Sequence, residues 1–198
     1  MIDVLIERTP YLAGGFAMNI VISILSMTFG TMLGVGMGAL RVRGGVIGKP
    51  ARLMTDLCRN VPSFVLMFYM AFMLPSEVDV TGVIYQVPLW LKATLALTFP
   101  VIGFASDQTL GYVRQRDAGL HGARETFLVA WVQYFLIIIM ASATASVIGA
   151  DEIVGRANIV IASGDGAGFL LATYVYVAFW FILTGLIVSG LSKALLRA

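Results

Sequence analysis

Few residues in this sequence have the types and spacing that catalysis or nucleotide binding requires. The segment 44–50, GGVIGKP, looks superficially like a phosphate-binding loop. However, Arg43 stands where the first glycine belongs, and Pro50 replaces the Ser or Thr. With one histidine, His121, and one cysteine, Cys58, the sequence offers no Ser-His-Asp triad, no His or Cys metal cluster and no intramolecular disulfide. We therefore expect no catalytic residues, no metal site and no cofactor bound by this chain.

The composition indicates a lipid environment. Of the 198 residues, 59% are hydrophobic and 12% are charged, and the mean hydropathy is +0.92. A soluble domain has about 25% charged residues, which it needs to cover its surface. The long apolar runs lack the alternating pattern of a membrane β-barrel. We predict an all-α integral membrane protein, a helix bundle that forms one domain over residues 1–198.

Charge-free stretches predict the elements that must position any functional residue. They indicate five membrane-spanning helices, over about 11–40, 53–74, 88–106, 127–147 and 169–194. The third helix is the weakest because it contains Lys92 near its start and Pro100 within it. We expect Lys92 to snorkel to the membrane interface, while neighbouring helices satisfy the backbone near the proline.

Basic residues are concentrated on one side of these helices. Ten of the 13 lie around the connection of the first two helices, around the connection of the third and fourth, or at the end of the fifth. The positive-inside rule places these segments in the cytoplasm, so we expect the N-terminus outside and the C-terminus inside. Because the first residues carry Asp3 and Glu7 and no basic run, we expect no cleavable signal peptide.

Small residues at a regular spacing predict a tight helix contact. Gly30, Gly34 and Gly38 repeat every four residues on the first helix, which lets another backbone approach closely. We expect this contact to form within the chain, with a contact between subunits as the alternative.

Polar side chains in two helices are candidates for the wall of a solute path. Ser142, Thr144 and Ser146 alternate in the fourth helix, a spacing that does not form one helical face. Either the helix is locally broken there and faces water, or the hydroxyls bond back to their own carbonyls. Tyr69 in the second helix is the other candidate. The absence of charge in the middle of each expected span argues against a proton relay.

Three segments carry a family pattern. Residues 15–38, GFAMNIVISILSMTFGTMLGVGMG, form a first helix with spaced small residues. Segment 58–75, CRNVPSFVLMFYMAFMLP, contains an Arg-x-x-Pro motif at Arg59 and Pro62. Segment 146–158, SVIGADEIVGRAN, has a Ser-x-Ile pattern followed by Glu152 and Ile153. Together these segments resemble the permease subunits of binding-protein-dependent ABC importers, specifically the polar amino acid branch. The resemblance covers most of the chain and implies five helices with the N-terminus outside.

The sequence departs from that family in one cytoplasmic loop. In the family, this loop carries a Glu-Ala-Ala…Gly segment whose short helix docks into the ATPase. Residues 107–127, DQTLGYVRQRDAGLHGARETF, contain no Glu-Ala-Ala and are visibly shorter. The candidates for a coupling surface are Arg114, Arg116, Asp117, Arg124 and Glu125, and a solvated loop is an equal alternative. Without the docking helix, the subunit needs a partner permease that retains one.

The resemblance implies a transmembrane permease subunit of an ABC-type importer for amino acids or similar small polar solutes, in the bacterial inner membrane. The expected partners are a second permease of different sequence, ATPase subunits that bind the ATP, an extracytoplasmic solute-binding protein and the lipid bilayer, but no nucleic acid. Asp151, Glu152 and Arg156 are candidates for contact with the binding protein, or form a solvated loop. The alternatives are an accessory or regulatory subunit derived from a permease, and a small secondary carrier or channel.

Overall fold

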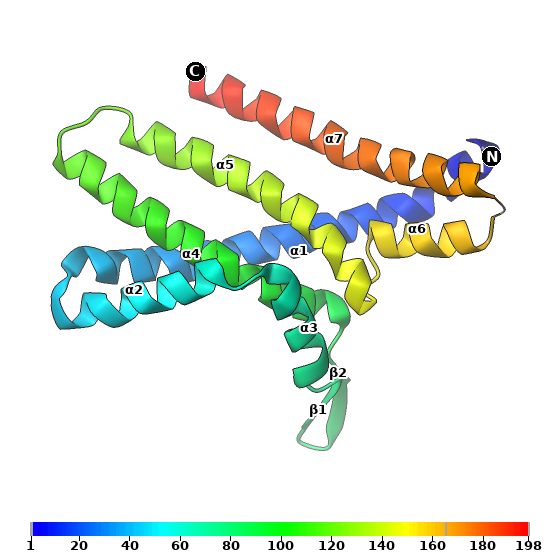
Figure 1. Cartoon of the computed structure of the whole chain (residues 1–198), viewed down its shortest axis with the longest axis horizontal. Coiled ribbons are helices and arrows are strands. Elements are labelled where there is room, and N and C mark those ends of the chain that lie inside the picture. The colour runs from blue at the N-terminus through cyan, green and yellow to red at the C-terminus, as the bar shows by residue number, and fades with distance from the viewer. Residues whose placement is uncertain (1, 165, 198) are drawn as a thin grey trace.

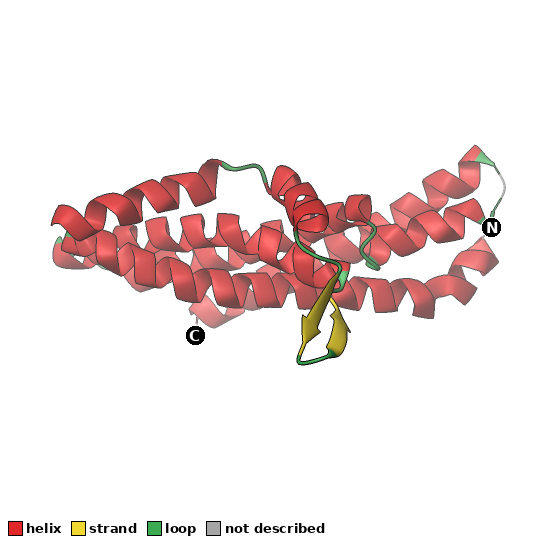
Figure 2. Cartoon of the chain, turned by 90° about the horizontal axis from the view of Figure 1, so that it is seen from below, coloured by secondary structure: helices red, strands yellow, loops and turns green. Residues whose placement is uncertain are grey.

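A computed structural model describes residues 2–164 and 166–197. Its elements in chain order are α1 Ile2–Arg43, α2 Gly45–Asn60, α3 Ser63–Met73, β1 Glu77–Val80, β2 Val83–Gln86, α4 Leu89–Asp117, α5 Ala123–Ser142, the 3-10 helix η1 Ala143–Ile148, α6 Ile153–Ala162 and α7 Ala167–Arg197. The molecule is an elongated helix bundle, in which α3 and the β1–β2 hairpin project sideways from the middle (Figures 1 and 2). The predicted helix bundle is thus confirmed, while the orientation in the membrane stays a prediction.

Four helices in the described part of the chain are long and apolar enough to cross a membrane. They cover Asp3–Arg43, Leu89–Asp117, Ala123–Ile148 and Ala167–Ala194. Helix α1 has 42 residues, or about 63 Å at 1.5 Å per residue, so it is much longer than a hydrocarbon core of about 30 Å. These helices match the first, third, fourth and fifth predicted spans, with longer ends.

The second predicted span, a continuous helix over 53–74, was wrong. Helix α2 ends at Asn60 and α3 begins at Ser63, with extended backbone at Val61 (ψ 123°) and Pro62 (ψ 128°) between them. Proline has no N–H to donate, and it disfavours helical backbone at the residue before it. Two short helices therefore replace one, and α3 has only 11 residues.

Helices α1 and α4 pack side by side in the same direction, through the spaced glycines. A Cβ atom built on Gly34 would lie 2.6 Å from Ala105 Cβ and 2.6 Å from the Ile102 carbonyl oxygen. One built on Gly38 would lie 2.8 Å from the Ser106 carbonyl oxygen, and Gly30 packs equally tightly on Val101. The three glycines thus lie against one helix of the same chain.

A small β-hairpin was not expected in an all-α fold. Strands β1 and β2 pair antiparallel, from Glu77 opposite Gln86 to Val80 opposite Val83. The turn between them has positive φ at Thr81 (55°) and at Gly82 (84°), as a two-residue hairpin turn requires. Both strands are exposed along their whole length, so the hairpin adds no core.

Buried apolar residues form two clusters along the bundle. The central cluster joins α1, α3, α4, α5 and η1 and includes Met27, Met67 and Leu97. The other joins the first half of α1 to α6 and α7 and includes Leu12 and Ile153. Helix α7 is otherwise largely exposed and apolar, as expected for a helix that faces lipid.

Lys92 does not reach the surface as we expected. Its residue is 1% exposed, and its Nζ donates to the carbonyl oxygens of Ala71 (3.1 Å) and Leu74 (2.9 Å). These carbonyls lie at the C-terminal end of α3, where a positive charge stabilises the unpaired backbone oxygens. Because α3 ends against α4, the ammonium group is satisfied inside the protein and has no need of the interface.

Candidate functional site

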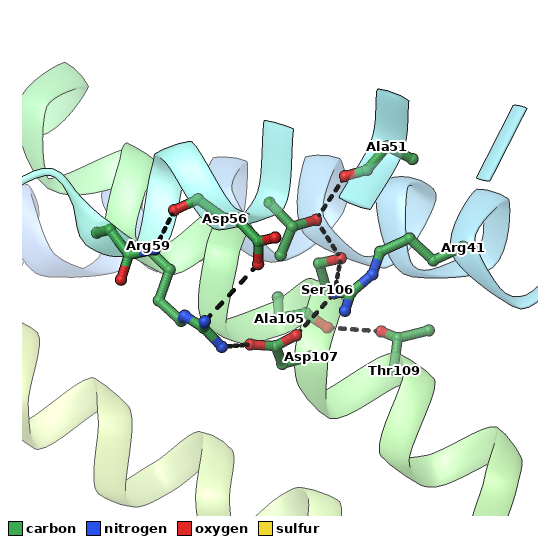
Figure 3. Close-up of polar contacts among 10 residues, drawn as sticks. Arg41, Ala51, Asp56, Arg59, Ala105, Ser106, Asp107 and Thr109 are labelled. Carbon is green, nitrogen blue, oxygen red and sulfur yellow. Dashed lines mark hydrogen bonds and ion pairs between the residues drawn. The ribbon is translucent and has the colours of Figure 1, made fainter. Parts of the chain in front are cut away.

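An ion network joins three helices near the basic end of the bundle (Figure 3). Asp107 on α4 accepts hydrogen bonds from Arg41 Nη1 on α1 at 2.7 Å and from Arg59 Nη1 on α2 at 3.0 Å. Arg41 also donates to Ser106 Oγ at 3.0 Å, and Ser106 Oγ lies 2.9 Å from Thr55 Oγ1. The Arg41 side chain is only 10% exposed, so water screens this pair less than a surface pair. The network fixes α2 against α1 and α4.

The family motif at Arg59 and Pro62 lies in this region. Gly103 on α4 packs against the backbone of Arg59, where a Cβ would lie 2.9 Å from the Arg59 nitrogen. Arg59 therefore pairs with Asp107 over a close helix contact, while Pro62 ends α2 three residues later. Pro62 thus determines where α2 ends, and Arg59 holds the end of α2 against α4.

A second polar network joins the middle of α1 to the start of α6, and it buries a carboxylate. Glu152 is 0% exposed, and it caps α6 by accepting from Val154 N at 3.0 Å and Gly155 N at 2.8 Å. Asn19 Nδ2 on α1 donates to Glu152 Oε2 at 3.0 Å and to Ser142 Oγ at 2.9 Å. Burial raises the pKa of Glu152 above its ordinary 4.5, although these hydrogen bonds oppose the rise.

Asp151 and Arg156 form a clamp beside that network. Arg156 makes two hydrogen bonds to the Asp151 carboxylate, at 2.8 and 2.7 Å, and donates to the Tyr11 carbonyl oxygen at 2.7 Å. Its guanidinium lies over the Tyr11 ring, 4.8 Å from the centroid, and crosses α1 where Gly14 leaves room. The hydrogen bond from Arg156 lowers the pKa of Asp151, and the same bond raises the pKa of Arg156.

The burial of Asp151, Glu152 and Arg156 decides which of these candidates could contact a binding protein. Glu152 was a candidate for that contact, but it is fully buried and cannot present its carboxylate to a partner. The side chain of Asp151 is 65% exposed and that of Arg156 is 18% exposed. Of these three residues, Asp151 is therefore the one whose charge is best exposed to a partner.

The four candidate path residues have different environments. Tyr69 on α3 is 56% exposed, and Thr144 on η1 is exposed, with its Oγ1 3.3 Å from Met67 Sδ. Ser146 is half-buried, whereas Ser142 is fully buried in the Asn19 network. Tyr69 on α3 and Thr144 on η1 are thus both exposed, whereas Ser142 is enclosed by the Asn19 network.

The alternating hydroxyls of Ser142, Thr144 and Ser146 lie where the helix changes form, and they also bond to their own backbone. The α-helix tightens into the 3-10 helix η1 at Ala143. Ser142, Thr144 and Ser146 each donate to the carbonyl three residues earlier, at 2.7, 2.7 and 3.0 Å. The local break is therefore a 3-10 segment, and the hydroxyls bond back to the backbone.

The candidate coupling residues lie on two helix ends joined by a short turn. Arg114, Arg116 and Asp117 end α4, and Arg124 and Glu125 begin α5. Residues 118–122 connect them without a helix, so α4 and α5 form a simple helical hairpin with no separate docking helix. Arg116 pairs with its neighbour Asp117 at 3.1 Å, and both side chains are exposed.

Asn19 was missed by the sequence interpretation, although its pattern was visible. Asn19, Ser23 and Ser26 are polar residues at helical spacing within the apolar run of α1, and all three are 0% exposed. Ser26 donates to the Thr94 carbonyl oxygen on α4 at 3.0 Å. Spacings of four and three residues predict one helix face, so this stripe indicated the buried side of α1.

The described residues contain no group of three His, Cys, Asp or Glu side chains that could hold a metal ion. Their charged groups join helices in pairs and short networks.

Two solved structures share this fold over nearly the whole chain. A crystal structure of an amino acid ABC transporter with histidines matches 98% of this chain and 96% of its own chain, at 19% identity and a TM-score of 0.77. The MetNI methionine ABC transporter in an inward-facing conformation matches 95% and 97%, at 15% identity and a TM-score of 0.65. No model of a known protein family and no curated protein sequence matches the chain. By this structural likeness, the chain has the fold of the membrane subunits of ABC transporters.

Proposed function

We propose that this protein is a permease subunit of an ABC-type importer for amino acids or similar small polar solutes. The observation that carries the proposal is the fold shared over 98% of the chain with a chain of an amino acid ABC transporter. The motif residues Arg59, Pro62 and Glu152 support it, because each one sets the position of a helix.

The proposal requires subunits outside this chain. ATPase subunits supply ATP binding and hydrolysis, an extracytoplasmic binding protein delivers the solute, and a second permease completes the path, in the bacterial inner membrane. The α4–α5 hairpin favours a second permease of different sequence, because residues 118–122 leave no docking helix. In this assembly, Arg114, Arg116, Asp117, Arg124 and Glu125 form a minor coupling surface, and Tyr69 and Thr144 contribute to the path wall.

The short turn at residues 118–122, between α4 and α5, also supports a second candidate function. An accessory or regulatory subunit derived from a permease needs no docking helix, because its conformation is not coupled to an ATPase. Such a subunit accompanies a complete permease pair instead of forming half of it. The two functions therefore differ in whether transport requires this chain.

Reconstituted uptake separates the candidates. Proteoliposomes are prepared with the purified complex and with the same complex lacking this chain, and uptake of a radiolabelled amino acid mixture is followed with and without ATP inside. An importer permease predicts ATP-dependent uptake that disappears without this chain. Uptake that persists without it favours the accessory subunit, and uptake by this chain alone without ATP indicates a secondary carrier.

A further inference from the structure

A cationic pocket opens between α1, α2 and α4 at the basic end of the bundle. Its volume is about 210 Å³, and it is lined by Arg41, Gly48, Arg52, Leu110 and Arg114. A single water needs roughly 10–15 Å³ of such space, so the pocket can hold a polyatomic group. Gly48 on α2 faces the α1 backbone, where a Cβ would lie 3.5 Å from the Leu40 carbonyl oxygen.

The charges around the pocket are not balanced. Arg41 is paired with Asp107, which it shares with Arg59. Among the side chains that the structure describes, Arg52 and Arg114 form no ion pair. Guanidinium groups brought together without carboxylates favour an anionic ligand, and their paired N–H groups match the oxygens of a phosphate.

The pocket lies where the charge-free parts of the helices end. Helix α1 carries no charge over residues 9–40, and Arg41 follows directly; α4 carries none over 93–106, and Asp107 follows directly. Arg41 and Asp107 are in contact, so the two boundaries lie at one level (Figure 3). In a bilayer, this is the level of the lipid headgroups, where basic pockets between helices bind lipid phosphate.

Helix α2, which supplies Arg52, also exposes large apolar side chains. Val46 is 88% exposed, Leu53 63% and Met54 52%. The face of α2 that packs inward instead carries small or polar residues, such as Gly48 and Thr55. An outward apolar face beside the basic side chains of the pocket suits a ligand with a charged head and hydrocarbon tails.

We propose that this pocket binds the phosphate of an anionic phospholipid, whose acyl chains lie along the apolar face of α2. The lipid would fix α2 to α1 and α4 at the membrane boundary, beside the Arg41–Asp107–Arg59 network. This inference does not depend on the importer function, since it concerns the chain and its bilayer alone.

The test measures lipid binding to the purified full-length chain, with any subunits that accompany it, by native mass spectrometry. Phosphatidylglycerol is titrated against phosphatidylcholine. The pocket variant R52Q/R114Q is compared with R43Q/R116Q, which removes two exposed arginines from the ends of α1 and α4 outside the pocket. We expect the pocket variant to bind phosphatidylglycerol at least about tenfold more weakly, since two charge-assisted hydrogen-bond donors are lost, and the control variant to bind like the wild type.

Three outcomes would overturn the proposal. Equal losses in the two variants would indicate general attraction between a basic surface and anionic lipid. Equal binding of the two lipids would exclude selection of an anionic headgroup. Displacement of the lipid by an equimolar amount of inorganic phosphate would assign the pocket to a free anion. If R52Q/R114Q does not fold, the single variant R52Q replaces it, because Arg52 is exposed and forms no ion pair among the described residues.

Discussion

Glu152 shows how a carboxylate is kept inside this bundle without a basic partner. Two backbone N–H groups of α6 and the Asn19 amide donate to its oxygens, and these three donors replace the water that burial removes. Asn19 Oδ1 in turn accepts from Ile153 N at 3.1 Å. The start of α6 is therefore joined to α1 through Glu152 and Asn19, and it loses this attachment if either side chain is removed.

Replacing Glu152 by Ala should lower the free energy of unfolding by about 2–4 kcal/mol, because the helix cap is lost and buried donors are left unpaired. Thermal unfolding of the purified protein in a mild detergent measures the change. The matched control is Asp151→Asn at the neighbouring exposed site, where removing a surface ion pair costs less than about 1 kcal/mol. Equal losses for both variants would contradict a special role for Glu152.

The raised pKa of Glu152 predicts a pH dependence of stability. Since the folded protein holds this proton to a higher pH than the unfolded chain, the contribution is complete below the ordinary value of 4.5. It declines as the pH rises through the raised folded pKa. The stability of the wild type relative to Glu152→Gln should therefore fall as the pH increases above 4.5. A difference that stays constant or grows over this range would be inconsistent with burial as the dominant cause.

At the scale of residues, the sequence predicted where polar and charged side chains occur better than it predicted what surrounds them in the fold. The spacing of Asn19, Ser23 and Ser26 contained enough information to identify a buried polar stripe. The burial of Lys92 could not be foreseen, because it depends on α3 ending beside α4 and presenting free carbonyls. A contact between residues so far apart in the chain does not change the local hydropathy from which the helices were predicted.

At the scale of elements, the α1–α4 contact is the main joint of the bundle, and two glycines on α1 test it. Gly34→Ala should destabilise the protein by about 1–3 kcal/mol, because the new methyl meets Ala105 and the Ile102 carbonyl. Gly36→Ala is the control: nothing lies within 4 Å of its Cβ position, and alanine favours the helix by up to about 1 kcal/mol. Chemical unfolding of both variants measures the difference. Similar stabilities would argue against a close helix contact at Gly34.

Lys92 is expected to hold the end of α3 in place. Lys92→Met retains most of the volume but leaves the Ala71 and Leu74 carbonyls without their donor, so we expect a loss of about 2–4 kcal/mol. Hydrogen exchange should also accelerate in α3 more than in α5. Lys49→Met, at an exposed position on α2, should change stability by less than about 0.5 kcal/mol. Unchanged exchange in α3 would refute this role for Lys92.

The elements themselves were largely predictable, except where hydropathy gave the wrong boundary. Four long apolar helices match predicted spans because their composition alone requires burial or lipid contact. The break between α2 and α3 was missed because apolar residues continue on its far side, although Pro62 provided the signal. Helix α4 runs to Asp117 rather than 106, since charge ends a membrane span without ending a helix.

At the scale of the whole molecule, the structure combines a complete permease-like fold with a minimal connection between α4 and α5. The likeness to an amino acid ABC transporter extends over nearly the full chain, yet residues 118–122 provide only a turn where a docking helix is expected. Under the proposed function, a chain with this short connection would depend on another permease subunit to couple transport to ATP hydrolysis. The proposed function therefore depends on which subunits assemble with this chain.

Subunit composition tests that claim most directly. The chain is tagged at its native locus, extracted in mild detergent and purified, and the masses of the intact complexes are measured by native mass spectrometry. We expect one copy of this chain with one permease of different sequence and two ATPase subunits. Recovery of this chain alone, or only as a homo-oligomer without an ATPase, would contradict it.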